Sequence, residues 1–135
     1  TAIVKECMRL YPPAWAVGRE AVKPWQLGPY EFPVGSQFVM SQWVVHRDPR
    51  FWERPAVFHP QRFLEDAPSH RFAYFPFGGG PRICVGNHFA MMEMVLVLAT
   101  LYQRVRFESD GEVELTPSVT LRPTHGIHAT AWRRD

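Results

Sequence analysis

Proline is the feature that most constrains how this chain can fold. Thirteen of its 135 residues are proline, spread from Pro12 to Pro123, and this is about twice the average usage. Because proline fixes φ and has no amide hydrogen, it ends helices and is kept out of the interior of sheets. Long uninterrupted helices should therefore be scarce, and neither a helical bundle nor a coiled coil is expected.

Two proline-free segments nonetheless have helical spacing. Residues 1–10 place apolar side chains at helical intervals, and this helix must end before Pro12 and Pro13. Residues 87–103 form a second, longer pattern that is apolar nearly all round, so we expect this helix to be deeply buried. Its main stripe consists of Ala90, Met94, Val97 and Leu101, with Leu98 beside it.

Short runs typical of β-strands occupy two other parts of the chain. Turn formers divide the first part into four runs, which predicts a small, mostly antiparallel sheet; the runs are 14–22, 25–27, 30–32 and 37–45. In the tail, Ser109-Asp110-Gly111 is a hairpin signal that should pair residues 105–108 with residues 112–115. Further strand-like runs follow at 119–121 and 126–132. The pattern predicts an α+β fold.

The stretch between these parts, residues 46–86, shows little periodicity. Such a long irregular segment in a compact domain usually has a function or wraps something. The chain begins at Thr1 directly in helix-like sequence and without an initiator Met. We therefore expect it to be the C-terminal piece of a longer protein.

Composition limits the kinds of partner. The chain is 46% hydrophobic with a net charge of +2, which suits one domain with a core but not a nucleic-acid surface. Its longest apolar run, residues 89–101, contains Glu93 and is shorter than the roughly 20 residues of a membrane span. Cys7 and Cys84 are too far apart for a metal-type pair, and no disulfide scaffold is indicated, so a reduced intracellular setting is expected.

The most specific feature is the segment Phe77-Gly78-Gly79-Gly80-Pro81-Arg82-Ile83-Cys84-Val85-Gly86. Its glycines permit an irregular loop that delivers one cysteine to the start of the long helix. The helix dipole and free amides there, together with the guanidinium of Arg82, should favour a thiolate over a thiol. A deprotonated cysteine shielded by Phe77 suits an axial metal ligand.

The pattern F-x-x-G-x-R-x-C-x-G in this segment resembles the haem-binding loop of the cytochrome P450 family. The resemblance implies that Cys84 is the proximal thiolate ligand of the iron of haem b (iron protoporphyrin IX). It also implies that Arg82 and Arg19 contact the two haem propionates, for which a bidentate guanidinium is suited. The other cofactor-binding residues implied in this way are Phe77, Gly78 and Gly86 of the loop.

Two further motifs occur in the family's order. Glu6-Cys7-Met8-Arg9 resembles its E-x-x-R helix, where the carboxylate and guanidinium share one helix face at i, i+3. Residues 58–63 resemble its F-x-P-x-R-F segment, with glutamine in place of the usual glutamate at position 61. Arg62 would then complete a Glu-Arg-Arg network with Glu6 and Arg9 that braces the fold and is not catalytic. His46-Arg47-Asp48-Pro49, with Phe51 and Trp52, fits the segment that leads into the family's meander.

The resemblance covers nearly all of residues 1–135 but only the last part, well under half, of the family's mainly α-helical domain. It implies a haem-thiolate monooxygenase that takes two electrons from a reductase or ferredoxin and uses O2 to oxidise a hydrophobic small molecule. The implied substrate-pocket residues are Ala14, Trp15, Ala16, Val17, Val119 and Thr120. No residue here is assigned as catalytic, because the family's acid–threonine pair is absent from the helical segments. The general character is that of a soluble, cytoplasmic, bacterial-type member, with an anchor upstream of Thr1 left open.

Other interpretations of the same residues remain open. A lone cysteine is more often a structural thiol, as we expect for Cys7, and Glu6 with Arg9 also fits an ordinary surface pair. A glycine run can cradle phosphate, but no Lys-Ser/Thr pair follows this one. His125 and His128 lack further ligands at zinc-like spacing, and Met91, Met92 and Met94 fit core filling. For the whole chain, the alternatives are a haem-binding module without catalysis and an inactive fragment that folds only with a partner.

Overall fold

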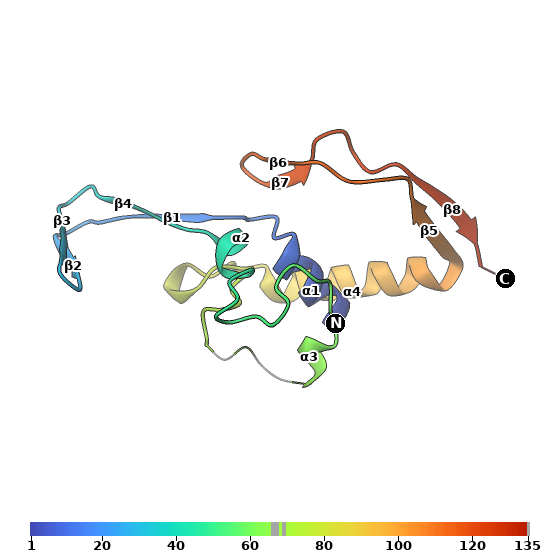
Figure 1. Ribbon diagram of the computed structural model, residues 1–135, viewed down its shortest axis with the longest axis horizontal. Helices are drawn as coiled ribbons and strands as arrows, with labels where there is room; N and C mark the ends of the chain where they lie inside the picture. The colour runs from blue at the N-terminus through green and yellow to red at the C-terminus, as the bar shows by residue number, and fades with distance from the viewer. Residues whose placement is uncertain (66–67, 69, 135) are drawn as a thin grey trace.

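Figure 1 shows the computed structural model, which describes residues 1–65, 68 and 70–134. The helices are α1 (Ala2–Leu10), α2 (Gln42–Val45), α3 (Arg62–Glu65), the 3-10 turn η1 (Gly80–Arg82) and α4 (Asn87–Arg104). The strands are β1 (Val17–Glu20), β2 (Trp25–Leu27), β3 (Tyr30–Phe32), β4 (Gln37–Met40), β5 (Val105–Ser109), β6 (Leu115–Pro117), β7 (Leu121–Pro123) and β8 (Ala129–Arg133). The arm made by β1 to β4 reaches out on one side of the helices, and β5 and β8 lie beyond the C-terminal end of α4 (Figure 1).

α1 supplies three of the six buried hydrophobic residues among the described ones. Val4 and Met8 lie one turn apart on one face, and they and Leu10 are 3%, 5% and 3% exposed. The helix ends at Leu10, where the amide of Tyr11 donates to the carbonyl of Cys7 at 2.6 Å. The proline pair that follows prevents continuation, in agreement with the sequence prediction.

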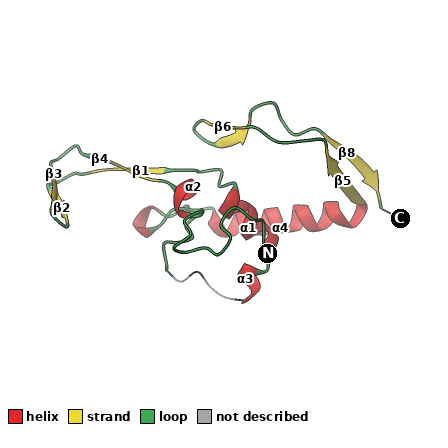
Figure 2. Ribbon diagram, in the orientation of Figure 1, coloured by secondary structure: helices red, strands yellow, loops and turns green. Residues whose placement is uncertain are grey.

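The N-terminal β region is antiparallel, as predicted, but it does not form one sheet. β1 pairs with β4, and β2 pairs with β3, as separate two-stranded ladders. Figure 2 shows the two ladders following one another along the arm. Rings of Trp25, Phe32 and Phe38 pack together where the ladders meet, with centroids 4.9 to 5.9 Å apart.

The strand predicted through residues 37–45 is wrong beyond Met40. Ser41 accepts a hydrogen bond from the amide of Val44 at 3.3 Å and so caps a short helix, α2. The first residue of that helix, Gln42, is fully buried. The strand therefore ends at Met40 and a helix follows. Its cap, Ser41, is a helix-start signal in the sequence that the strand prediction overlooked.

α4 has the predicted position, but the prediction that it is deeply buried is wrong for this chain. None of its residues is buried, and Phe89, Met92 and Leu96 are 65%, 56% and 58% exposed. Its half-buried residues lie along one side of the helix: Asn87, Ala90, Met91, Met94, Val95 and Leu98. A helix that is apolar on all sides needs packing neighbours on every side. The described residues provide such neighbours on one side of α4. Met92 accordingly does not fill a core.

The tail strands pair differently from the predicted hairpin. β5 pairs with β8, so that Val105 lies opposite Arg133 and Ser109 lies opposite Ala129, while β6 pairs with β7 inside this outer pair. Residues 112–114, predicted to pair with β5, form a connection instead. A turn signal fixes only its neighbours, whereas β8 offers β5 a longer ladder of main-chain hydrogen bonds.

The irregular middle of the chain agrees with the prediction over its described residues. Apart from α2, α3 and η1, residues 46–86 are loops and turns; positions 66, 67 and 69 lie outside the described part. The structure is of the α+β type. None of the described helices is long and apolar enough to cross a membrane.

Candidate functional site

The segment that carries Cys84 is a glycine-dependent loop held by main-chain hydrogen bonds. Gly78 and Gly80 have φ angles of +75° and +72°, a region that side-chain-bearing residues rarely adopt. The amide of Cys84 donates to the carbonyl of Phe77 at 3.0 Å, which closes the loop. The carbonyl of Cys84 in turn accepts from the amide of Asn87 at 3.4 Å, where α4 begins. Cys84 is therefore delivered to the N-terminal end of α4.

Cys84 is exposed, and neither it nor Cys7 is in a disulfide. Its neighbours Ile83 and Val85 are 50% and 101% exposed. A Cβ placed on Gly86 would lie 3.9 Å from the Cys84 sulfur, in van der Waals contact with it, so Gly86 lies directly beside the sulfur. The loop thus presents a thiol among uncovered apolar side chains. Phe77, predicted to shield the sulfur, is half-buried.

Close packing against Phe72 requires the second glycine of the loop. A Cβ on Gly79 would lie 2.7 Å from Cε1 of Phe72, which is closer than atoms approach in folded proteins. A pocket of about 240 Å³ lies between this loop, α1 and α4, with Lys5, Phe77 and Met91 among its lining residues. The loop therefore rests on α1 and α4 without filling the space between them.

The two arginines predicted to meet propionates are exposed and lie on different elements. Arg82 is at the end of η1, two residues before the cysteine, and Arg19 is in β1. Arg19 donates to the carbonyl of its neighbour Gly18 at 2.7 Å. Within the part of the chain that the structure describes, no hydrogen bond or ion pair joins Arg19 to the Cys84 loop.

Glu6, Arg9 and Arg62 come together in the interior. The guanidinium of Arg9 binds the Glu6 carboxylate through Nε at 2.8 Å and through Nη2 at 2.9 Å. Arg62 Nε donates to Glu6 Oε1 at 3.3 Å, the same oxygen that accepts from Arg9 Nη2. Glu6 and Arg9 are 0% exposed and the Arg62 side chain is 12% exposed. The i, i+3 spacing accounts for the contact between Glu6 and Arg9, and the fold brings Arg62, which the resemblance grouped with them, to the same carboxylate.

Main-chain groups complete the surroundings of Arg9. Its Nη1 donates to the carbonyls of His46 and Pro55, both at 2.7 Å, and its Nη2 donates to that of Val57 at 3.2 Å. With the two bonds to Glu6, every one of the five N–H groups of an arginine has an acceptor. A buried charge is tolerated on this condition. Arg9 thereby ties α1 to three points of the irregular segment.

The same arrangement controls the protonation of Glu6. Burial by itself raises the pKa of this carboxyl, but the hydrogen bonds from Arg9 and from the amide of His59, with the charges of Arg9 and Arg62, outweigh it. The net pKa of Glu6 is below its ordinary value. Glu6 is therefore an anion at neutral pH and matches the cations around it.

Aromatic side chains enclose the two guanidinium groups. Trp52 is 5% exposed and lies 5.1 Å from the Arg9 guanidinium carbon and 5.9 Å from that of Arg62. Tyr74 donates from its hydroxyl to the carbonyl of Lys5 at 3.0 Å, and burial raises the pKa of Tyr74. We call Glu6, Arg9, Trp52 and Arg62 the Arg9 cluster. Glu6, Arg9 and Trp52 of this cluster are buried, and the Arg62 side chain is 12% exposed.

His46 is a buried residue that sequence reasoning missed. It was quoted only as part of a motif, yet it is 0% exposed and its Nε2 accepts the amide hydrogen of Phe75 at 2.9 Å. A sequence signal was available in the spacing, because His46 follows Gln42 by four residues; in the structure both are buried. A helical reading of residues 42–46 would have put them on one face.

The two predicted substrate-pocket segments lie together. Trp15 Nε1 donates to the carbonyl of Ser118 at 2.8 Å, and the amide of Leu121 donates to the carbonyl of Pro13 at 2.8 Å. Val119 and Thr120 thus stand beside the segment that follows α1, with Val119 92% exposed. The members of these segments are half-buried or exposed: Ala14, Trp15, Ala16, Val17, Val119 and Thr120.

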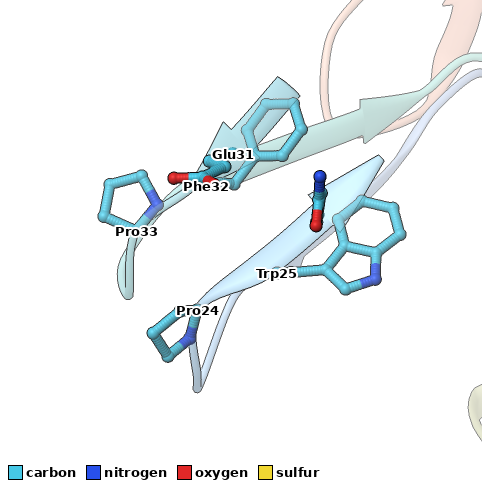
Figure 3. Close-up of a pocket in the computed structure, with 6 residues that line it drawn as sticks. Pro24, Trp25, Glu31, Phe32 and Pro33 are labelled. Atoms are coloured by element: carbon cyan, nitrogen blue, oxygen red, sulfur yellow. The ribbon is translucent and has the colours of Figure 1, made fainter. Parts of the chain in front are cut away.

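A larger pocket, of about 590 Å³, belongs to the arm. Figure 3 shows Pro24, Trp25, Phe32 and Pro33 around it, at the ends of β2 and β3. None of its lining residues is a predicted site residue. Among the tail histidines, His125 Nε2 lies 3.6 Å from Oε2 of Glu114. The described residues contain no group of three or more metal-ligating side chains.

The comparisons with known proteins agree on one family. The family model for cytochrome P450 matches residues 1–129. The putative cytochrome P450 132 of Mycobacterium tuberculosis is 42% identical over 99% of this chain and 30% of its own length. Cytochrome P450 4d2 of Drosophila melanogaster is 36% identical over 93% of this chain and 26% of its own length.

Solved structures give the same result. A cyanobacterial CYP120A1 described as retinoic acid bound has a TM-score of 0.91 at 30% identity, over 98% of this chain and 32% of its own. A 6-coordinated cytochrome P450 from Thermus thermophilus has a TM-score of 0.84 at 35% identity, over 99% of this chain and 37% of its own. The chain spans about a third, or less, of the length of these proteins. The cysteine loop and the buried Glu-Arg-Arg cluster agree with these matches, and the chain belongs to the cytochrome P450 family.

Proposed function

We propose that these 135 residues are the C-terminal, haem-binding part of a single haem-thiolate monooxygenase domain, and that Cys84 is the axial ligand of the haem iron. The observation that carries the proposal is the exposed thiol of Cys84, held by main-chain hydrogen bonds at the start of α4. The cofactor that we infer is haem b. Family membership supports haem as the cofactor, since P450 proteins bind it.

The residues present fit a haem. A cysteine sulfur is a soft ligand that P450-type iron accepts, and here the cysteine is exposed, with Gly86, which has no side chain, beside its sulfur. Ile83, Val85 and Phe89 flank it with at least half of each side chain uncovered. An apolar macrocycle seated on the sulfur would cover these groups, which is favourable because apolar surface leaves water. The chemistry of the donor and the apolar rim therefore agree.

The side chains of the chain would share the work as follows. Cys84 would hold the iron from one side and donate electron density to it. Arg82 and Arg19, both exposed cations, would bind carboxylates of the macrocycle edge through guanidinium hydrogen bonds. Phe77, Gly78 and Gly86 would shape the loop around the sulfur. Haem, when bound, supplies the O2-dependent redox chemistry of the reaction.

The Arg9 cluster would act at a distance from the chemistry. Arg9 fixes α1 to the carbonyls of His46, Pro55 and Val57, and Arg62 adds the carbonyl of Glu53. These contacts brace the irregular segment from which the Cys84 loop emerges. The cluster thus has a structural role in this proposal.

The substrate that we propose is a hydrophobic small molecule. The joined segments around Trp15 and Val119 offer an apolar wall with exposed side chains. A relative of known structure is described with retinoic acid bound, which is a molecule of this class. Electrons would come from a reductase or ferredoxin, and one atom of O2 would enter the substrate while the other leaves as water.

The exposed helix α4 supports the view that the domain extends beyond these residues. An 18-residue helix with no buried residue has more apolar surface than this chain covers. The proteins that it resembles are about three times as long. We expect the 135 residues by themselves not to hydroxylate efficiently, because their helices lack the acid–threonine pair of the family.

The proposal is tested by adding haem and carbon monoxide under reducing conditions to the complete gene product and to the 135-residue chain. Thiolate-ligated ferrous haem has a characteristic absorption band, which we expect in the complete protein. Cys84→Ala should abolish this band. Cys7→Ala, at the other cysteine of the chain, is the matched control and should retain it.

Four results would count against the proposal or a part of it. A band that survives in Cys84→Ala would show that another group ligates the iron. Haem uptake with neither a thiolate band nor NADPH-dependent turnover would favour a haem-binding module without catalysis. No haem uptake by either protein would favour an inactive fragment. Turnover by the 135-residue chain equal to that of the complete protein would contradict the view that the domain extends further.

A further inference from the structure

His46 occupies a position between α1, α2 and the segment that enters the Cys84 loop. Its ring centroid lies 5.2 Å from that of Tyr74 and 5.3 Å from that of Phe75. Its carbonyl accepts from Arg9 at 2.7 Å, and its amide donates to the carbonyl of Gln42 at 2.8 Å. The residue is therefore fixed on three sides, and none of the roles proposed above uses its imidazole.

The hydrogen bond from Phe75 determines the state of the ring. Nε2 of His46 accepts the Phe75 amide hydrogen at 2.9 Å, so this nitrogen carries no proton and the neutral ring must carry its hydrogen on Nδ1. Nδ1 has no hydrogen-bond partner among the described residues. In an imidazolium both nitrogens are donors, and a donor at Nε2 would face the Phe75 amide. Protonation of His46 must therefore break this bond.

Main-chain hydrogen bonds connect Phe75 to the cysteine. The carbonyl of Phe75 accepts from the amide of Gly78 at 2.9 Å, which closes the turn at the start of the loop. The carbonyl of Phe77, inside that turn, accepts from the amide of Cys84 at 3.0 Å. The Phe75 amide also donates to the side chain of His46. This hydrogen bond joins the chain of main-chain bonds that ends at Cys84 to the residue that follows α2.

The surroundings of the imidazole keep it neutral. Burial lowers the pKa of His46 to about 4; the main-chain carbonyls of Met8 and Arg9 oppose this, and the charges of Arg9 and Arg47 add to it. The groups that face the ring are Arg9 from α1, Arg47 from the residue after α2, and Tyr74 from the loop segment, with Glu6 paired to Arg9. The anion among these groups, Glu6, is already paired with Arg9 and Arg62, so its carboxylate does not stabilise an imidazolium at His46.

We propose that His46 is a positioning residue for the Cys84 loop: its neutral imidazole accepts the amide of Phe75 and so holds the turn from which Cys84 is presented. The connection to haem rests on the proposed function, but the hold on the loop does not. Protonation or loss of the acceptor releases Phe75 and loosens residues 75–84.

The test compares three variants of the complete gene product by amide hydrogen exchange, measured without haem, and by the thiolate absorption band of the haem-loaded protein. His46→Leu removes the acceptor. His46→Gln keeps an acceptor, Oε1, that does not titrate. His128→Gln, at an exposed tail histidine, is the matched control.

At pH 7 we expect residues 75–84 of His46→Leu to exchange about tenfold faster than in the wild type, because a buried amide loses its partner. His46→Gln should restore slow exchange, and His128→Gln should not differ from the wild type. Below about pH 5 the wild type should begin to exchange fast in the same segment and lose its thiolate band, whereas His46→Gln should keep both.

Equal exchange over residues 75–84 in wild type and His46→Leu would overturn the proposal. So would an acid transition that is the same in His46→Gln and the wild type. If His46→Leu does not fold, the comparison of His46→Gln with the wild type across pH still decides the matter. If no protein gives a thiolate band but the exchange results hold, the proposed function fails while the role of His46 stands.

Discussion

Arg9 and Arg82 stand in the two most specific motifs of the chain, and their surroundings are opposite. Arg9 is 0% exposed, with acceptors for all of its N–H groups in Glu6 and three main-chain carbonyls. Arg82 and the cysteine beside it are exposed. One motif is satisfied within these residues, and the other presents its polar groups outward.

This difference separates residues that make the fold from residues that use it. Buried charge is stable only when its partners are in place, and Arg9 has an acceptor for each of its N–H groups among the described residues. An exposed thiol with apolar neighbours adds little to the stability of the fold, so the Cys84 loop is suited to binding a cofactor that would cover it. Substitutions in the two regions should accordingly affect different measurements.

The largest expected effect on folding is that of Arg9→Leu. It leaves Glu6 buried beside Arg62 alone and removes the donors to three carbonyls, and breaking a buried pair in this way costs about 3 to 5 kcal/mol of unfolding free energy. Urea denaturation measures it. Arg50→Leu, which breaks an arginine–aspartate pair whose arginine side chain is 78% exposed, is the control and should leave the urea midpoint unchanged. Equal midpoints for the two variants would contradict the role given to the Arg9 cluster.

Acid should weaken the buried region next. The pKa of His46 is lowered from an ordinary 6.5 to about 4, so between these values the unfolded chain binds a proton that the folded chain does not. Stability is therefore complete above about pH 6.5 and falls as the pH drops toward 4, by roughly 3 kcal/mol in all. Urea midpoints from pH 7 to pH 4 measure the loss. His46→Gln should show a smaller dependence over this window, and an identical dependence would refute the assignment.

The glycine of the loop turn should matter less for folding. Gly78 has φ +75°, so Gly78→Ala puts a side chain in the left-handed region and should cost about 1 kcal/mol. Gly18→Ala in β1, where φ is not in that region and the nearest atom to the new Cβ lies at 4.0 Å, is the control and should fall within about 0.5 kcal/mol of the wild type. Thermal unfolding of both variants decides whether the left-handed backbone is the cause.

Cys84→Ala should change folding least. Its side chain is exposed, so the unfolding free energy should stay within about 0.5 kcal/mol of the wild type, although the thiolate band is lost. Cys7→Ala should do the reverse, since Cys7 is half-buried on α1: the band stays and some stability is lost. If Cys84→Ala destabilised the protein as much as Arg9→Leu, the division into a buried structural region and an exposed functional loop would be wrong.

Local patterns in the sequence predicted what depends on near neighbours. The end of α1 followed from a proline pair, and the Glu6–Arg9 contact followed from i, i+3 spacing. The irregular path of the Cys84 loop followed from its glycines, two of which have positive φ. Each of these is decided within one turn of chain, where steric rules act directly.

Contacts between distant segments were predicted poorly. β5 pairs with β8 and not with the residues after the Ser109 turn, because many registers satisfy the same alternation and the ladder length decides among them. α4 was expected to be buried, but a periodic pattern shows only that a helix is apolar and does not show that a neighbour covers it. The family resemblance, by contrast, was confirmed by the comparisons.

The sequence by itself determined the family, the two helices and the loop that ends at Cys84, because these depend on short motifs and on backbone rules that act within a few residues. The tertiary structure alone decided that His46 is buried and that its Nε2 accepts the Phe75 amide hydrogen. It also brings Arg62 to Glu6 across 56 positions, a contact that the family resemblance implied but that no local pattern in the sequence predicts. Burial and the choice of a hydrogen-bond partner depend on which distant segments meet, and no local pattern contains that information.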